Sequence, residues 1–69
     1  MEKIYLREDY IKLGQALKAA GLVDSGVDAK YVIQDGQVLV NGNVELQRGK
    51  KLLEGDLVEF NGEQILICR

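Results

Sequence analysis

The sequence predicts an α+β domain in which two packed helices lie against a small, mostly antiparallel sheet of short strands. Apolar residues follow helical spacing between positions 13 and 33, and the period falls to two after Gly36. Two Asn-Gly steps, at 41–42 and 61–62, each separate two short apolar runs. With 69 residues, the chain is expected to form a single domain over residues 1–69 with a thin aliphatic core.

The first elements expected are a short strand and a helix. The strand is the β-prone run Ile4-Tyr5-Leu6, which Glu8-Asp9 ends. One helical stripe then follows at i, i+3, i+4 and i+7, formed by Leu13, Ala16, Leu17 and Ala20. Gly21 suits the C-terminal stop. Lys18 falls on the opposite face of this helix, where we expect it to be solvated.

A second helix is expected to begin after Ser25. Ser25 and Asp28 form a variant of the capping box, with Asp in place of the usual Glu or Gln. Its apolar stripe comprises Ala29, Val32 and Ile33, and Gly36 fits the position just beyond the helix. We expect Tyr31 to cover the edge of the core rather than to stack on a base, because aromatic burial is the common case.

Four short strands complete the expected order. Asn-Gly tolerates positive φ at both positions, so each Asn-Gly step predicts a hairpin. The first hairpin joins residues 38–40 to 43–46, and the second joins 57–60 to 63–67. The predicted order is therefore strand, two helices and four strands.

The charge of the chain is unevenly distributed. The net charge is −2 and the isoelectric point is about 5.0, which by itself counts against nucleic-acid binding. However, Arg48-Gly49-Lys50-Lys51 is the only dense basic run and contains no acid. A local positive patch on an acidic body is expected, with binding that is weak and sensitive to salt.

The sequence lacks the residues of an enzyme site. It has no His, Ser25 has no base at a recognisable spacing, and Cys68 stands alone near the C-terminus. The acids follow no metal-ligand pattern and the glycines fit no nucleotide loop. We therefore expect no catalysis, no metal, no cofactor and no small-molecule substrate. With no apolar signal core, no span of membrane length and a single thiol, a cytoplasmic protein is expected.

These segments together resemble the S-four type RNA-binding domain family, named after a small-subunit ribosomal protein and built on the αL motif. The resemblance covers about residues 12–58. It rests on Lys12-Leu13, the segment Ser25 to Lys30, the signature Gly36 to Gly42, the basic stretch Arg48 to Leu52, and Gly55-Asp56. Chain length and residues 13–18 favour the short free-standing bacterial branch typified by YaaA and YbcJ proteins. Two positions depart from the pattern: Val27 replaces a frequent Gly, and Gln47 replaces an expected Arg.

The resemblance implies a monomer that binds structured RNA, either rRNA or tRNA, or ribosomal particles, in ribosome assembly or translation. Recognition would rest on the RNA backbone and shape more than on base edges. The implied RNA-binding residues are Lys12, Ser25, Gly26, Lys30, Gln34, Asn41, Arg48, Lys50 and Lys51. Within this set, Lys30 and the basic run are expected to supply the phosphate contacts, together with the amides at the start of the second helix.

Simpler roles stay open for the same residues. Ser25 can act only as a helix cap, and Gly36, Asn41 and Gly42 only as turn residues. Lys30 can be plainly solvated, and the basic run can be a solubilising loop. The rival function is a protein–protein interaction module on the same fold, with weak or no RNA binding, which the acidic balance favours.

Overall fold

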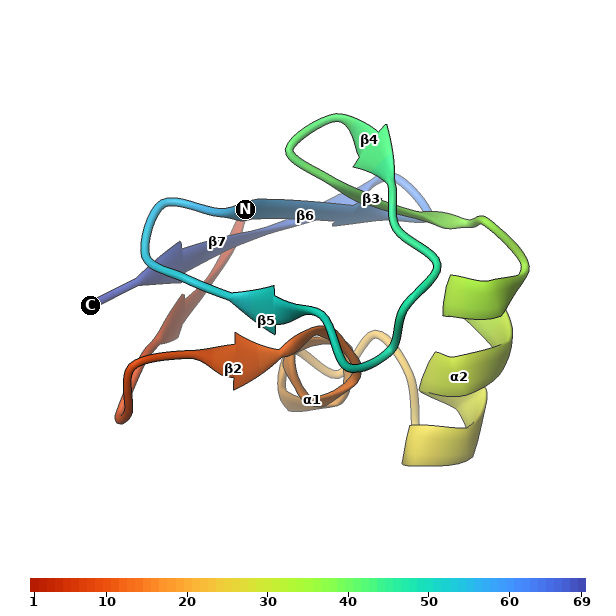
Figure 1. Cartoon of the computed structure of the whole chain (residues 1–69), viewed down its shortest axis with the longest axis horizontal. Helices are drawn as coiled ribbons and strands as arrows, with labels where there is room; N and C mark the ends of the chain where they lie inside the picture. The colour runs from red at the N-terminus through yellow and green to blue at the C-terminus, as the bar shows by residue number, and fades with distance from the viewer.

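A five-stranded sheet and two helices form the two layers of this computed structural model, which describes all 69 residues (Figure 1). The strand order is β1-β7-β6-β3-β4, and β2 and β5 form a separate two-stranded ribbon. The elements are β1 (Glu2–Tyr5), β2 (Ile11–Lys12), α1 (Leu13–Ala19), α2 (Gly26–Gln34), β3 (Val38–Val40), β4 (Asn43–Val44), β5 (Lys51–Leu52), β6 (Leu57–Phe60) and β7 (Glu63–Cys68). The predicted fold class is confirmed.

Both predicted hairpins are present. Asn41 and Asn61, with φ of 52° and 54°, adopt the left-handed conformation that these tight turns require. The hairpins pair β3 with β4 and β6 with β7, and β3 also pairs with β6, all antiparallel. β1 lies parallel to β7, from Glu2 opposite Ile65 to Tyr5 opposite Cys68. This pairing of the two ends of the chain has no local signal in the sequence.

The first strand was predicted at residues 4–6, whereas β1 spans Glu2–Tyr5. The predicted order of elements was wrong in two further respects. It omitted β2 and β5, which have two residues each and are therefore too short to show a period. It also extended the strand after Asn41-Gly42 to residue 46, whereas β4 ends at Val44. Beyond β4 the Glu45 N–H still donates to Val38 O at 3.0 Å, and the Glu45 carboxylate accepts a hydrogen bond from the Gln47 N–H at 3.2 Å.

The core lies between the helices and the inner face of the sheet. Eleven apolar residues are buried there and no polar side chain is. The helices contribute the predicted stripes, of which Leu17 and Ile33 are fully buried. Tyr31 does not cover the core edge as predicted: its side chain is 67% exposed on α2. The position is on the outer face of the helix, where no other element packs.

Residues with capping conformations mark both ends of α2. Ser25 Oγ accepts a hydrogen bond from the Asp28 N–H at 3.2 Å, which is one half of the predicted capping box. The other half, in which the Ser25 N–H would donate to the Asp28 carboxylate, does not form. Gly36, just beyond the end of α2, has a φ of 79°, as expected for a residue that follows a helix.

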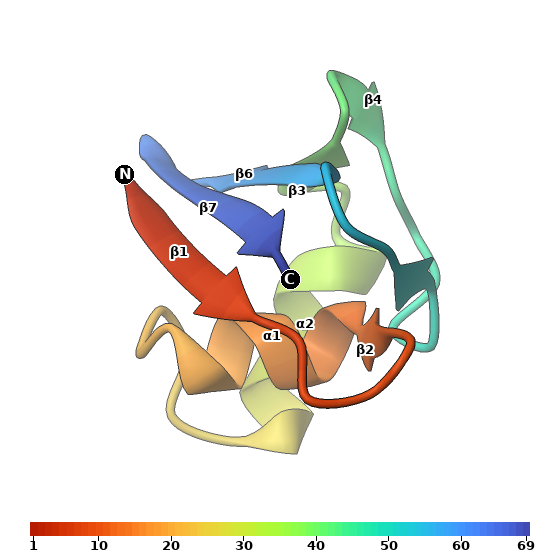
Figure 2. The same ribbon diagram turned by 90° about the vertical axis from the view of Figure 1, so that its left-hand side faces the viewer.

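α1 and α2 run in clearly different directions under the sheet (Figures 1 and 2). Neither helix is long and apolar enough to cross a membrane.

Candidate functional site

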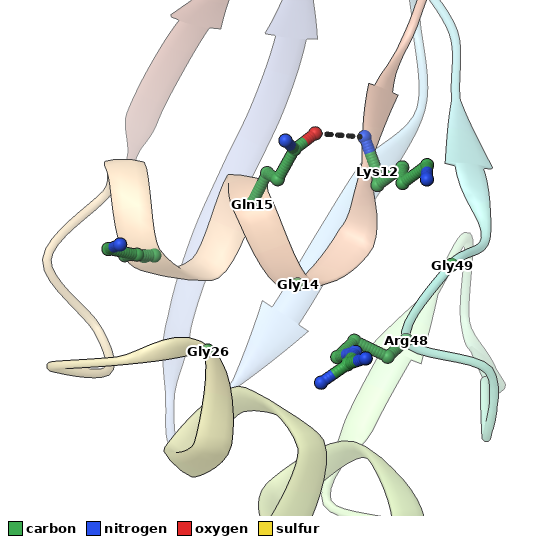
Figure 3. Close-up of a pocket in the computed structure, with 7 residues that line it drawn as sticks. Lys12, Gly14, Gln15, Gly26, Arg48 and Gly49 are labelled. Carbon is green, nitrogen blue, oxygen red and sulfur yellow. Dashed lines mark hydrogen bonds between the residues drawn. The ribbon is translucent and has the colours of Figure 1, made fainter.

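A polar cleft opens where α1, the start of α2 and the β4–β5 loop meet (Figure 3). Its volume is about 320 Å³ and none of its seven lining residues is hydrophobic. We call it the basic cleft; its lining residues are Lys12, Gly14, Gln15, Lys18, Gly26, Arg48 and Gly49. Three of these residues are cations, one is a glutamine and three are glycines, so the side chains of the cleft suit a polar ligand better than an apolar one.

The β4–β5 loop is attached to the first turn of α1 by main-chain hydrogen bonds. The Leu13 N–H donates to Lys50 O at 2.8 Å, and the Gly14 N–H donates to Arg48 O at 3.1 Å. These are amides that a helix N-terminus leaves without an intrahelical partner. At the same turn, Gln15 Oε1 accepts the Lys12 N–H at 3.3 Å (Figure 3). The first turn of α1 therefore holds the loop instead of an anion.

Gly14 lets Arg48 pass close over α1. A β-carbon at position 14 would lie 2.7 Å from Arg48 Cγ, closer than unbonded carbon atoms can approach, and 3.3 Å from Cδ, which is a tight contact. Only glycine therefore leaves room for the aliphatic part of Arg48. The guanidinium is thereby directed into the space between α1 and Gly26 (Figure 3).

The start of α2 forms the opposite wall of the basic cleft. Gly26 is the first residue of α2, and the amides of Gly26 and Val27 make no hydrogen bond within the chain. Such amides and the helix dipole favour an anion. The exposed Asp28 carboxylate in the same turn opposes this effect, so the lysine and arginine side chains must provide most of the attraction.

The charges in the basic cleft have one sign. Lys12, Lys18 and Arg48 are all exposed, and no acid lines the cleft. None of the three is paired, because the only ion pair of the chain joins Arg69 to Asp9 at 3.5 Å. Three unpaired cations around one hollow attract an anion with several charged oxygens, such as a phosphate chain. No group of His, Cys, Asp or Glu side chains could hold a metal ion.

The structure places the predicted RNA-binding residues in different regions. Lys12, Gly26 and Arg48 line the basic cleft, and Ser25 caps the helix beside it. Lys30 and Gln34 are exposed on α2 but do not line the cleft. Their contact with RNA stays a prediction.

Asn41, Lys50 and Lys51 also lie outside the basic cleft. Asn41 Nδ2 donates to Asp56 Oδ1 at 3.0 Å, and its Oδ1 accepts the Leu57 N–H at 2.9 Å. Both polar groups of this side chain thus stabilise the turn, which is the structural role left open for it. Lys51 Nζ lies 4.8 Å from the centre of the Tyr10 ring, a cation–π contact that directs it toward the β1–β2 loop.

Sequence reasoning missed Lys18, Gly14, Gln15 and Gly49. Lys18 is exposed, as predicted, and it is also one of the three cations of the basic cleft. A signal was present in the spacing. Gly14 and Gln15 lie four and three residues before Lys18, so both are next to Lys18 on the surface of α1. The signal could be used only with the knowledge that the β4–β5 loop packs against this face.

Known proteins are similar to this chain over most of its length. The S4 domain family model matches residues 4–68. A Bacillus subtilis (strain 168) protein named as a probable ribosome maturation protein, RlbA, is 42% identical over 59 residues, covering 86% of this chain and 83% of that protein. YbcJ of Escherichia coli (strain K12) is 34% identical over 61 residues, covering 88% and 87%.

The solved structures include a match over the whole chain. The solution structure of Escherichia coli YbcJ, described as having an αL motif involved in RNA binding, superposes with a TM-score of 0.76 at 33% identity. The match covers 100% of this chain and 89% of that one.

Proposed function

The chain belongs to the S4 domain family, and from this premise we propose that it binds structured RNA in the basic cleft and acts in ribosome maturation. The RNA is an rRNA or tRNA segment, free or within a ribosomal particle. The role is that of a non-catalytic, monomeric, cytoplasmic binding protein. The names of its relatives, a probable ribosome maturation protein and a protein with an RNA-binding αL motif, support this assignment.

The observation that carries the proposal is the convergence of Lys12, Lys18 and Arg48 on one cleft without an acid or an internal partner. Cations left unpaired in this way are available to replace the counterions of an RNA backbone. They come from α1 and from the β4–β5 loop, which are tied together through Leu13 and Gly14. The main-chain positions that carry the cations are therefore fixed relative to one another before RNA binds, which favours recognition of backbone shape.

Binding measured at two salt concentrations tests the proposal. Fluorescence anisotropy with a labelled rRNA stem-loop should show binding at low salt. If about three phosphate contacts form, the dissociation constant should rise roughly 20- to 40-fold between about 50 and 200 mM salt. The Lys18→Gln/Arg48→Gln variant should lose most of the affinity and much of the salt dependence.

A matched control separates the basic cleft from the charge of the whole protein. Lys3→Glu lowers the net charge by the same two units, and the exposed Lys3 lines neither the cleft nor any other hollow of the surface. This control should retain binding to within about twofold, since it removes no cation from the cleft and the remaining effect of net charge is weakened by salt. Equal losses in both variants, or no binding of any structured RNA at low salt, would favour the protein-interaction module instead.

A further inference from the structure

A second groove lies next to the basic cleft, between β1, the β1–β2 loop and α1. Its volume is about 440 Å³, and six of its nine lining residues are hydrophobic. Figure 2 views this side of the molecule, with β1 and the loop in front of α1. We call it the tyrosine groove, because Tyr5 and Tyr10 are its two aromatic lining residues.

The two hollows share one residue. Gln15 lines both the basic cleft and the tyrosine groove. Its Oε1 is occupied by the Lys12 N–H at 3.3 Å, which fixes the side chain, while its amide N–H groups make no hydrogen bond within the chain. A ligand that extends from the basic cleft past Gln15 therefore enters an apolar groove and meets a free hydrogen-bond donor at the boundary.

The tyrosines of the groove remain accessible although apolar residues surround them. Tyr5 is 64% and Tyr10 is 38% exposed. Lys51 Nζ lies over the Tyr10 ring, 4.8 Å from its centre, and restrains it. On the same loop, the Arg69–Asp9 ion pair ties the segment before Tyr10 to the C-terminus. Both tyrosines thus present aromatic surface to solvent within the groove.

Building on the proposed RNA binding, we infer that the tyrosine groove receives one unpaired nucleobase of the RNA whose phosphates occupy the basic cleft. Exposed aromatic rings are the surfaces on which unpaired bases stack. Arg7, which also lines the groove, supplies a cation for the phosphate next to that base. Glu8 is the acid of the groove; it accepts a hydrogen bond from a base amino group and repels a second phosphate.

The basic cleft and the tyrosine groove differ in the charges that line them. The basic cleft has three cations and no acid, whereas the tyrosine groove has one cation, one acid and mainly apolar walls. The basic cleft suits a run of phosphates, and the tyrosine groove suits a base with one neighbouring phosphate. The expected ligand is therefore a stem interrupted by a bulged or flipped nucleotide, rather than a continuous duplex.

Two RNAs that differ by one nucleotide test this inference. An RNA stem and the same stem with a single-nucleotide bulge are compared by fluorescence anisotropy. The bulged stem should bind about tenfold more tightly, within the range that stacking one base on an aromatic residue provides. Tyr10→Leu should remove this preference and leave the affinity for the continuous stem unchanged. Tyr5→Leu, at the more exposed tyrosine, should reduce the preference and serves as a second variant if Tyr10→Leu impairs folding.

Tyr31→Leu is the matched control, because Tyr31 is 67% exposed on α2 and does not line the groove. It should keep both the affinity and the preference. The chain has three tyrosines and no tryptophan, so tyrosine fluorescence in a Tyr31→Phe background reports on Tyr5 and Tyr10 alone. The bulged stem should quench this emission more than the continuous stem does at saturation.

The outcomes separate this inference from the proposed function. Equal affinities for the two RNAs, with the cleft variants still weakening both, would overturn the nucleobase site and leave the basic cleft intact. A loss of both affinities in Tyr10→Leu and Tyr5→Leu would also overturn it, since the tyrosines would then act on RNA binding in general. No binding of either RNA at low salt would overturn both proposals.

Discussion

Gly14 lies against the aliphatic part of Arg48 so closely that a β-carbon at position 14 would be 2.7 Å from Arg48 Cγ. The same two residues are joined by a hydrogen bond from the Gly14 N–H to Arg48 O, at 3.1 Å. The missing side chain of one residue thus determines where the cation of the other can lie. Gly14 is best understood as a positioning residue of the basic cleft.

Gly14→Ala should displace Arg48 and weaken RNA binding. Arg48 is exposed, so its side chain can swing away from the new methyl group at small cost. The higher helix propensity of Ala offsets part of that cost, and the free energy of unfolding should change by less than about 1 kcal/mol. RNA affinity should nevertheless fall nearly as much as in Arg48→Ala. Anisotropy and urea unfolding measure the two quantities separately.

A double-mutant cycle isolates this mechanism. In an Arg48→Ala background no Cγ remains to be displaced, so Gly14→Ala should cause no further loss of RNA affinity. Gly26→Ala is the stability control, because a β-carbon there meets no atom within 4 Å. It should leave the free energy of unfolding unchanged or raise it by about 0.4–1 kcal/mol. Additive losses in the double variant would contradict the positioning role.

The elements with local signals were predicted correctly from the sequence. Ser25 and Gly36 mark the ends of α2, and the Asn-Gly steps mark both hairpins, because each signal is contained within a few residues. The pairing of β1 with β7 and the β2–β5 ribbon were missed, since they join segments far apart in the chain. Such contacts depend on the packed core and leave no local pattern.

The candidate site was predicted in part for the same reason. Arg48 stood out because it belongs to the one dense basic run, and Lys12 and Ser25 because they precede helices. Lys18 looked like an ordinary surface lysine, and Asn41 like a contact for RNA. Their positions in the structure depend on the β4–β5 loop packing on α1 and on Asp56 lying beside the Asn41 turn, which no local pattern indicates.

Asn41 should contribute to stability rather than to RNA binding. Asn41→Gly keeps the left-handed conformation but removes the hydrogen bonds to Asp56 and Leu57, at a cost of about 1–2 kcal/mol. Asn61→Gly is the matched control: its φ of 54° is nearly the same as the 52° of Asn41, but its side chain makes no hydrogen bond within the chain. Urea unfolding of both variants measures the difference, and equal stabilities would show that the Asn41 hydrogen bonds contribute little.

The thin core predicts strong sensitivity to large-to-small substitutions. Leu17 is 0% exposed and belongs to a core of only eleven residues. Leu17→Ala should lower the free energy of unfolding by about 2–5 kcal/mol. That loss is comparable to the whole stability of roughly 3–10 kcal/mol expected for a domain of this length. Circular dichroism during urea titration should show partial or complete unfolding at 25 °C, whereas Leu53→Ala, at a 55% exposed position, should change the midpoint little.

Lys18 and Lys30 offer a direct test of which face binds RNA. Both are exposed lysines on helices, but Lys18 lines the basic cleft and Lys30 does not. If the cleft holds the phosphates, Lys18→Gln should weaken binding more than Lys30→Gln and should reduce the salt slope by about one. Each substitution removes one positive charge from an exposed helical site, so net charge and folding are matched. Anisotropy over a series of salt concentrations gives both slopes. A larger effect at Lys30 would move the RNA surface from the cleft to the outer face of α2.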